Sequence, residues 1–129
     1  MERNKAAFRA IRETLGIPQQ DLAQRLDVKP LSVKRWESPK YPQNAPVRVW
    51  DMMCSLLEQQ RETVADALGN AGDSAELPYW ACSQDFEDFA DADDPAQTWT
   101  EANATARAIA QALELEGIDV TWYNAAEDA

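Results

Sequence analysis

The sequence predicts a mainly α-helical chain, in which an N-terminal domain of four or five helices precedes a small α+β module. Apolar residues recur at helical spacing through the first half, and the last apolar run alternates as a strand does. Between the halves lies a segment rich in glycine and turn-forming residues at 69–74. With 129 residues, 45% of them hydrophobic, the chain can form one compact domain with an attached module. We therefore predict a domain at 1–68 and a module at 75–129.

Helix-ending residues define the elements of the first half. An apolar stripe through residues 8–17 predicts a first helix, which Gly16 ends, since glycine just past a periodic run is a common helix stop. A second helix is expected at about 19–26. The third, at about 29–37, opens with a proline, which costs no hydrogen bond at the first helical position. A fourth helix is expected from near Pro46 to about residue 68.

The second half is expected to hold a short amphipathic helix in the acidic run 85–94, an alanine-rich helix at about 100–116 and a strand at 118–123. The alanine-rich helix has more apolar surface than a two-turn helix and one strand could cover within a single subunit. Exposed apolar patches of this size mark interfaces, so we predict a homodimer through this module. Its expected contact residues are Ala102, Ala106, Ile109, Leu113, Ile118, Val120 and Trp122.

Charge is distributed very unevenly between the two halves. Residues 1–48 carry ten basic and five acidic side chains, a net charge of +5, whereas residues 49–129 carry two basic and eighteen acidic, a net charge of −16. Local field rather than total charge determines where a polyanion docks. The first half is therefore the part expected to meet double-stranded DNA.

Composition argues against several other classes of protein. The sequence has no histidine, Cys54 and Cys82 are isolated, and the acidic run lacks the glycine and distal glutamate of a calcium loop, so we expect neither a metal nor a cofactor. No nucleophile motif or phosphate-binding glycine loop points to an enzyme. No apolar run is long enough for a membrane span, and the charged N-terminus is unlike a signal peptide, so a cytoplasmic location is expected.

Residues 19–37, QQDLAQRLDVKPLSVKRWE, carry the strongest motif. Two helices that cross over a turn of three or four residues need a small residue at the close approach, here Ala23, and apolar residues that form a shared wedge. Asp27 occupies the turn position where a positive φ is often required, and aspartate tolerates it less well than glycine. The third helix keeps a polar outer face. The pattern predicts a helix-turn-helix.

This segment resembles the helix-turn-helix of the lambdoid phage repressor and Cro-type (Xre) superfamily, over about residues 8–57. The resemblance implies a sequence-specific transcriptional regulator, a dimeric repressor at a near-palindromic operator. It places Gln19 toward a phosphate, Arg35 toward bases, and Arg12 and Glu37 in a buried ion pair between the first and third helices. The matching residues are Arg12, Gly16, Gln19, Leu22, Ala23, Leu26, Val28, Val33, Trp36 and Glu37.

Further DNA contacts are expected around the third helix. By the same resemblance, Lys29, Leu31, Ser32 and Lys34 lie at or near the DNA surface. The loop and the next helix N-terminus add candidates for phosphate contact, because helix N-termini attract phosphate. These candidates are Lys40, Tyr41, Gln43 and Asn44.

Two features keep a second interpretation open. Pro30 and Leu31 replace the polar residues usual at the tip of the third helix, and the second half is strongly acidic. Both would suit a protein-interaction module, antitoxin-like or adaptor, whose motif does not bind DNA. The order of elements after residue 77 resembles the C-terminal module of YdiL-like regulators and anti-CRISPR-associated autorepressors, and this resemblance implies a homodimer held by the C-terminal modules.

Overall fold

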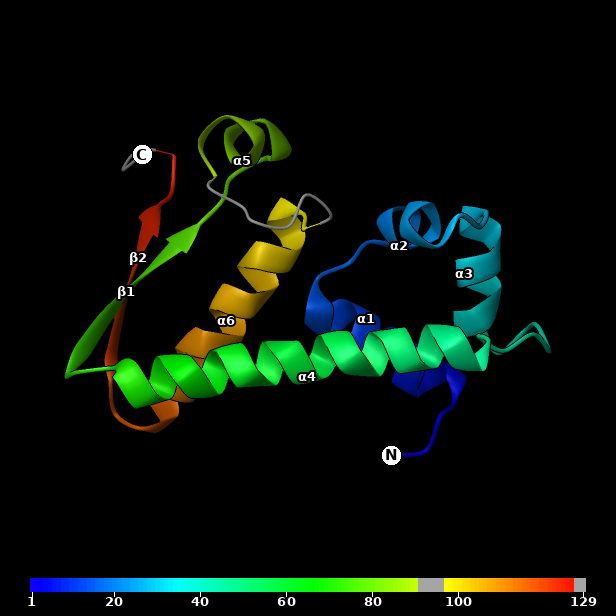
Figure 1. Cartoon of the computed structure of the whole chain (residues 1–129), viewed down its shortest axis with the longest axis horizontal. Coiled ribbons are helices and arrows are strands. Elements are labelled where there is room, and N and C mark those ends of the chain that lie inside the picture. Colours follow the sequence, from blue (N-terminus) through cyan, green and yellow to red (C-terminus); the bar gives the residue numbers. More distant parts are fainter. Residues whose placement is uncertain (91–96, 127–129) are drawn as a thin grey trace. The chain divides into compact units, whose positions relative to one another are not determined.

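The computed structural model describes residues 1–90 and 97–126, and over these residues it is mainly helical, as predicted (Figure 1). The chain divides into two compact units, Met1–Gln59 and Gln60–Ala129. No helix in the described part of the chain is long and apolar enough to cross a membrane. In chain order the elements are α1 (Lys5–Leu15), α2 (Gln19–Leu26), α3 (Pro30–Glu37), α4 (Val47–Asn70), β1 (Ser74–Tyr79), α5 (Ser83–Phe89), α6 (Trp99–Leu115) and β2 (Asp119–Asn124).

The core of the first unit is built by apolar faces of α1, α2, α3 and the first turns of α4. Phe8 lies at its centre, with its ring edge-to-face to Trp36 at 6.0 Å and to Trp50 at 5.3 Å between centroids. Such aromatic pairs add stability beyond the area that they bury. The other buried members are Ile11, Leu15, Ile17, Leu22, Ala23, Val33, Val49 and Met53.

Two left-handed residues set the path of the chain between the first three helices. Gly16 ends α1 with φ 72°, and its N–H bonds back to the helix. Asp27 ends α2 with φ 55°, and it is the one residue other than glycine with a positive φ in the described ranges. Aspartate adopts this conformation more readily than most residues, because its short polar side chain can hydrogen-bond to the nearby backbone. Both ends lie where the sequence predicted them.

The second unit contains a two-stranded parallel sheet. β1 and β2 pair from Ser74 opposite Asp119 to Tyr79 opposite Asn124, and α6 packs against both strands. A capping box starts α6: the Thr98 side chain accepts from the Glu101 N–H, and the Glu101 carboxylate accepts from the Thr98 N–H. This reciprocal pairing satisfies N–H groups that the first helical turn otherwise leaves open.

β1 was not predicted, and its presence changes the expected boundaries. Pro78 lies inside the strand, and a proline argues against a strand unless that strand is at an edge, where the missing N–H faces solvent. In a sheet of two strands every strand is an edge. The expected linker at 69–74 is also largely absent, because α4 continues through Asn70 and β1 begins at Ser74. Instead, the boundary between units falls inside α4.

β1 also corrects the expected dimer interface. Ala106 is 7% exposed and Leu113 is 1% exposed, because α6 packs against the two strands of its own chain. These two residues cannot contact a partner without repacking. Ala102, Ile109, Ile118 and Val120 are half-buried, and Trp122 is 41% exposed. The acidic helix is shorter than expected, since α5 ends at Phe89, and the end of the run, 91–94, lies outside the described residues.

A buried asparagine anchors the end of β1 to α6. Asn103 is 3% exposed, and its amide oxygen accepts from the backbone N–H of Trp80 at 2.8 Å while its amide nitrogen donates to the carbonyl of Trp80 at 2.9 Å. Both backbone groups of Trp80 are thereby satisfied just past the strand, where the ladder no longer supplies a partner. Sequence reasoning missed this residue, because an asparagine among alanines gives no sign of its partner.

Candidate nucleic-acid interface

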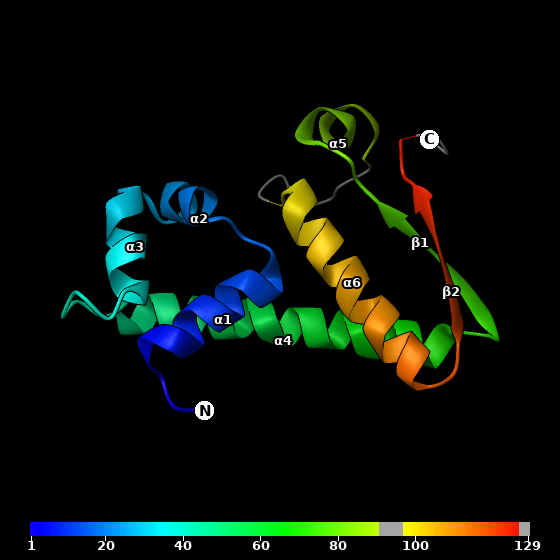
Figure 2. The ribbon, with the colours of Figure 1, turned by 180° about the vertical axis from the view of Figure 1, so that it is seen from behind.

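α2 and α3 are two eight-residue helices joined by the short turn 27–29, and α3 is steeply inclined to α2 (Figure 2). Leu22 and Ala23 of α2 and Val33 and Trp36 of α3 are buried between them and the rest of the first unit. The small side chain of Ala23 permits the close approach. As a result, the side of α3 opposite these buried residues faces solvent.

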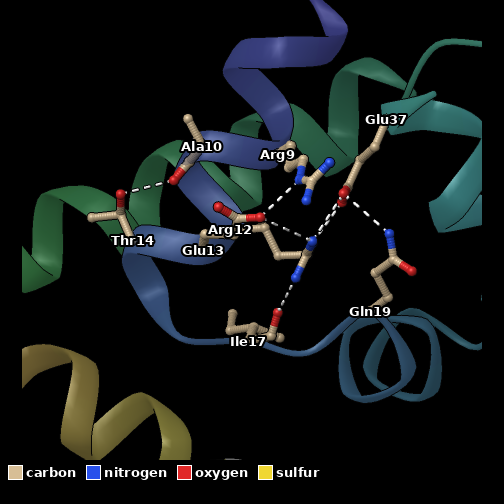
Figure 3. Close-up of polar contacts among 8 residues, drawn as sticks. All are labelled: Arg9, Ala10, Arg12, Glu13, Thr14, Ile17, Gln19 and Glu37. Atoms are coloured by element: carbon tan, nitrogen blue, oxygen red, sulfur yellow. Dashed lines mark hydrogen bonds and ion pairs between the residues drawn. The ribbon is translucent and has the colours of Figure 1, made fainter. Parts of the chain in front are cut away.

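A buried ion pair fixes α3 to α1. Arg12 Nε donates to Glu37 Oε2 at 2.5 Å and Arg12 Nη2 donates to Glu37 Oε1 at 2.9 Å, so the pair is bidentate (Figure 3). The side chains are 10% and 4% exposed. Arg12 Nη1 donates to the carbonyl of Ile17 at 2.9 Å, which ties the segment entering α2 to the same guanidinium. The pair that the resemblance implied is therefore present.

Gln19 joins this network. Its Nε2 donates to Glu37 Oε1 at 3.1 Å, so the first residue of α2 is held to the last residue of α3 (Figure 3). An amide nitrogen carries two hydrogens, and the one not used on Glu37 is the donor that phosphate contact would require. Phosphate contact by Gln19 remains a prediction.

A more exposed pair lies beside the network on α1. Arg9 Nε donates to Glu13 Oε1 at 2.7 Å. This hydrogen bond is the main cause that lowers the pKa of Glu13, and it raises the pKa of Arg9. Because both side chains are more than half exposed, solvent screens the pair and it contributes little to stability.

The outer face of α3 is cationic. Lys29 and Lys34 are exposed, Ser32 and Arg35 are half-buried, and Leu31 is 45% exposed at the first turn. The leucine side chain has no hydrogen-bonding group to offer at this tip.

The cations around α3 lack carboxylate partners among the described residues. Arg3, Arg9 and Arg12 each form an ion pair, whereas no ion pair is found for Lys29, Lys34, Arg35 or Lys40 in the described part of the chain. Glu37 is the one acid between residues 28 and 48, and Arg12 holds it. Direct ion pairs with described residues therefore do not neutralise these four cations.

The loop after α3 carries the remaining candidates. Lys40, Tyr41, Gln43 and Asn44 are all exposed. Asn44 lies too early to cap α4, because the first backbone bonds of that helix run from Val49 and Trp50 to the carbonyl of Pro46.

Lys5 also helps to hold this site together, and the sequence analysis did not predict this role. Its ammonium donates to the carbonyl of Arg35 at 2.7 Å and also to the carbonyl of Gln43. The two carbonyls lie in α3 and in the loop that follows, so one side chain of α1 holds both. Pairing with backbone carbonyls leaves no pattern of complementary side chains for sequence reasoning to find.

No protein-family model matches this chain, and none of the curated proteins compared with it is similar enough to count as a match.

Proposed function

We propose that the chain is a sequence-specific regulator of transcription, a dimeric repressor that inserts α3 into the major groove of DNA. In this proposal α2, the turn and α3 act as a helix-turn-helix of the phage repressor and Cro type. The observation that carries the proposal is the group of cations around α3, Lys29, Lys34, Arg35 and Lys40, which have no carboxylate partner among the described residues. Unneutralised lysine and arginine on one face are the electrostatic footprint of nucleic-acid binding.

The net charge of −11 does not oppose this proposal. Exposed charges more than about 8–10 Å apart are largely screened at physiological salt, so the field at α3 is set by its immediate neighbours. The first unit, Met1–Gln59, contains α3 and has a net charge of +3. The acidic residues of the second unit then disfavour contact of that unit with DNA, which restricts docking to the cationic face.

The test is selection of binding sequences from a random duplex library, followed by titration of the best site and of a scrambled site over a range of salt. We expect discrimination between the sites and a linear fall of log K with log salt. If three or four cations of each chain contact phosphate, a dimer gives a slope of about −5 to −7. No selected sequence, with weak binding equal for both sites, would favour the protein-interaction module instead.

We further propose that the second unit supplies the dimer contact. After the correction for Ala106 and Leu113, the large apolar side chains left exposed in this unit are Phe89, Leu115 and Trp122. The two-stranded sheet also has open edges, which can pair with a further strand. Pairing with a second copy would cover an edge and the apolar residues near it.

Replacing Arg35 with alanine is expected to weaken binding to the selected site by about 1–3 kcal/mol, the usual cost of losing one base contact. Binding to scrambled DNA should change much less, because phosphate contacts position the protein but do not read sequence. Titration of both duplexes at one salt concentration measures the difference. The control is Arg9→Ala, since Arg9 is an exposed arginine already paired with Glu13. An equal loss on both duplexes would show that Arg35 does not read bases.

A further inference from the structure

The loop that follows α3 is folded back against the end of that helix. The Ser38 N–H bonds to the carbonyl of Lys34 at 3.0 Å, and the Tyr41 N–H bonds to the carbonyl of Ser38 at 3.3 Å. Lys5 then joins the last turn of α3 to Gln43 through two backbone carbonyls. The carbonyl end of a helix carries partial negative charge, so the ammonium of Lys5 is favourably placed there. Residues 38–43 are thus fastened at both ends.

This fold places the ring of Tyr41 against the guanidinium of Arg35. The Arg35 Cζ lies 5.5 Å from the centre of the Tyr41 ring, which is within the range of a cation–π contact. The two residues are six apart in sequence, and only the return of the loop brings them together.

No hydrogen bond from the Arg35 side chain to a described residue is found, although the Arg35 backbone carbonyl accepts from Lys5. Arg35 Nε is buried and has no partner among the described residues, and the guanidinium forms no ion pair with them. A buried, unpaired donor is unfavourable, so a structural role alone would not favour this arrangement. The arrangement is, however, suitable for a guanidinium whose flat face rests on an aromatic ring. Its terminal N–H groups then stay available for hydrogen bonds to another molecule.

We propose that Tyr41 is a positioning residue for sequence reading, which holds the guanidinium of Arg35 by stacking, and that Lys5 fixes the loop that carries Tyr41. This inference rests on the proposed function. An arginine side chain has many rotamers, and ordering them on binding opposes affinity. If the Tyr41 ring already orders Arg35 in the free protein, less side-chain entropy is lost on binding. This gain applies only at the selected site, where Arg35 contacts its correct base. Tyr41 therefore contributes to the discrimination between sequences.

This role differs from the phosphate contact that the sequence suggested for Tyr41. A phosphate contact would use the phenolic hydroxyl and would raise affinity for every duplex. Stacking uses the ring and raises the ratio of affinities for the selected and scrambled sites. Tyr41→Phe and Tyr41→Leu separate the two roles, because phenylalanine keeps the ring without the hydroxyl and leucine removes both.

The experiment measures the affinity ratio for selected and scrambled duplexes with the full chain and its variants at one salt concentration. Tyr41→Phe should leave the ratio unchanged, whereas Tyr41→Leu should lower it by about 2- to 5-fold, the range of an exposed cation–π contact. Lys5→Met should also lower the affinity ratio, because the loop that carries Tyr41 is then no longer fixed. Tyr41 is 37% exposed, so the melting temperatures of the two Tyr41 variants are expected to stay close to that of the parent, and they serve as the folding control for these variants.

A second measurement needs no DNA. The Arg35 Nε–H signal in ¹⁵N relaxation should show an ordered side chain in the parent and in Tyr41→Phe, and a more mobile one in Tyr41→Leu. An unchanged affinity ratio in Tyr41→Leu, or a loss in Tyr41→Phe equal to that in Tyr41→Leu, would overturn the positioning role while the proposed function stands. If the parent does not discriminate between duplexes at all, the proposed function fails and the role fails with it.

Discussion

Replacing Glu37 with alanine is expected to lower the free energy of unfolding by about 3–5 kcal/mol, because it leaves the guanidinium of Arg12 buried without its counter-charge. Arg12 would keep its bond to the carbonyl of Ile17 but would lose both hydrogen bonds to Glu37, and Gln19 would lose its acceptor. Since the Arg12 side chain is only 10% exposed, little water is present to compensate. Urea unfolding followed by circular dichroism measures the change.

The matched control is Glu13→Ala. Glu13 is the other carboxylate near Arg12, at 4.0 Å from its Nη2, but it is 55% exposed, so its removal should destabilise the fold far less than removal of Glu37. A double variant, Arg12→Met with Glu37→Leu, replaces the pair by apolar side chains and should recover much of the loss. If Glu37→Ala unfolds at the same urea concentration as the parent, the pair does not stabilise this fold.

The first three helices could be predicted because their signals are local. Gly16 and Asp27 end helices through their own backbone preferences, and the proline at the start of α3 suits only the first helical turn. The apolar residues between them recur at the helical period. Each of these signals lies within a few residues of the feature that it determines, so no tertiary information is needed.

β1 could not be predicted in the same way. Its pairing with β2 is parallel and joins residues 45 positions apart, from Ser74 with Asp119 onward, so neither strand carries the mark of a hairpin. The proline inside β1 argues against a strand wherever both edges are paired. Because β1 was missing from the prediction, the apolar face of α6 was expected to need a second subunit, although the strands of the same chain cover part of it.

Within the candidate site, the sequence indicated which residues are cationic but not how they are held. The partners of Arg35 and Lys5 are an aromatic face and backbone carbonyls, and neither kind of partner leaves complementary charges in the sequence. The Arg12–Glu37 pair is different, since it was expected from a family resemblance that covers both of the helices that the pair joins. Contacts that depend on the path of a loop can be predicted only once the path of that loop is known.

Cutting the chain after Asp73 is expected to convert a dimer of 14.5 kDa subunits into a monomer and to weaken binding to the selected site by about 10²- to 10⁴-fold. The cut keeps α4 whole, because that helix ends at Asn70, and it retains the core cluster, whose buried members all lie between Phe8 and Met53. It removes β1, α5, α6 and β2, where the dimer contact is proposed. Light scattering gives the mass, and titration gives the affinity.

The size of the expected loss follows from how a dimer reads an operator. One recognition helix contacts only a few base pairs, and two helices about 34 Å apart read half-sites one turn of DNA apart. Once one subunit is bound, the second binds at high effective concentration, and a monomer lacks that gain. Binding to a single half-site should therefore be nearly the same for the fragment and the full chain. A full chain that is monomeric at micromolar concentration, or a folded fragment that still dimerises, would remove the second unit from the dimer contact.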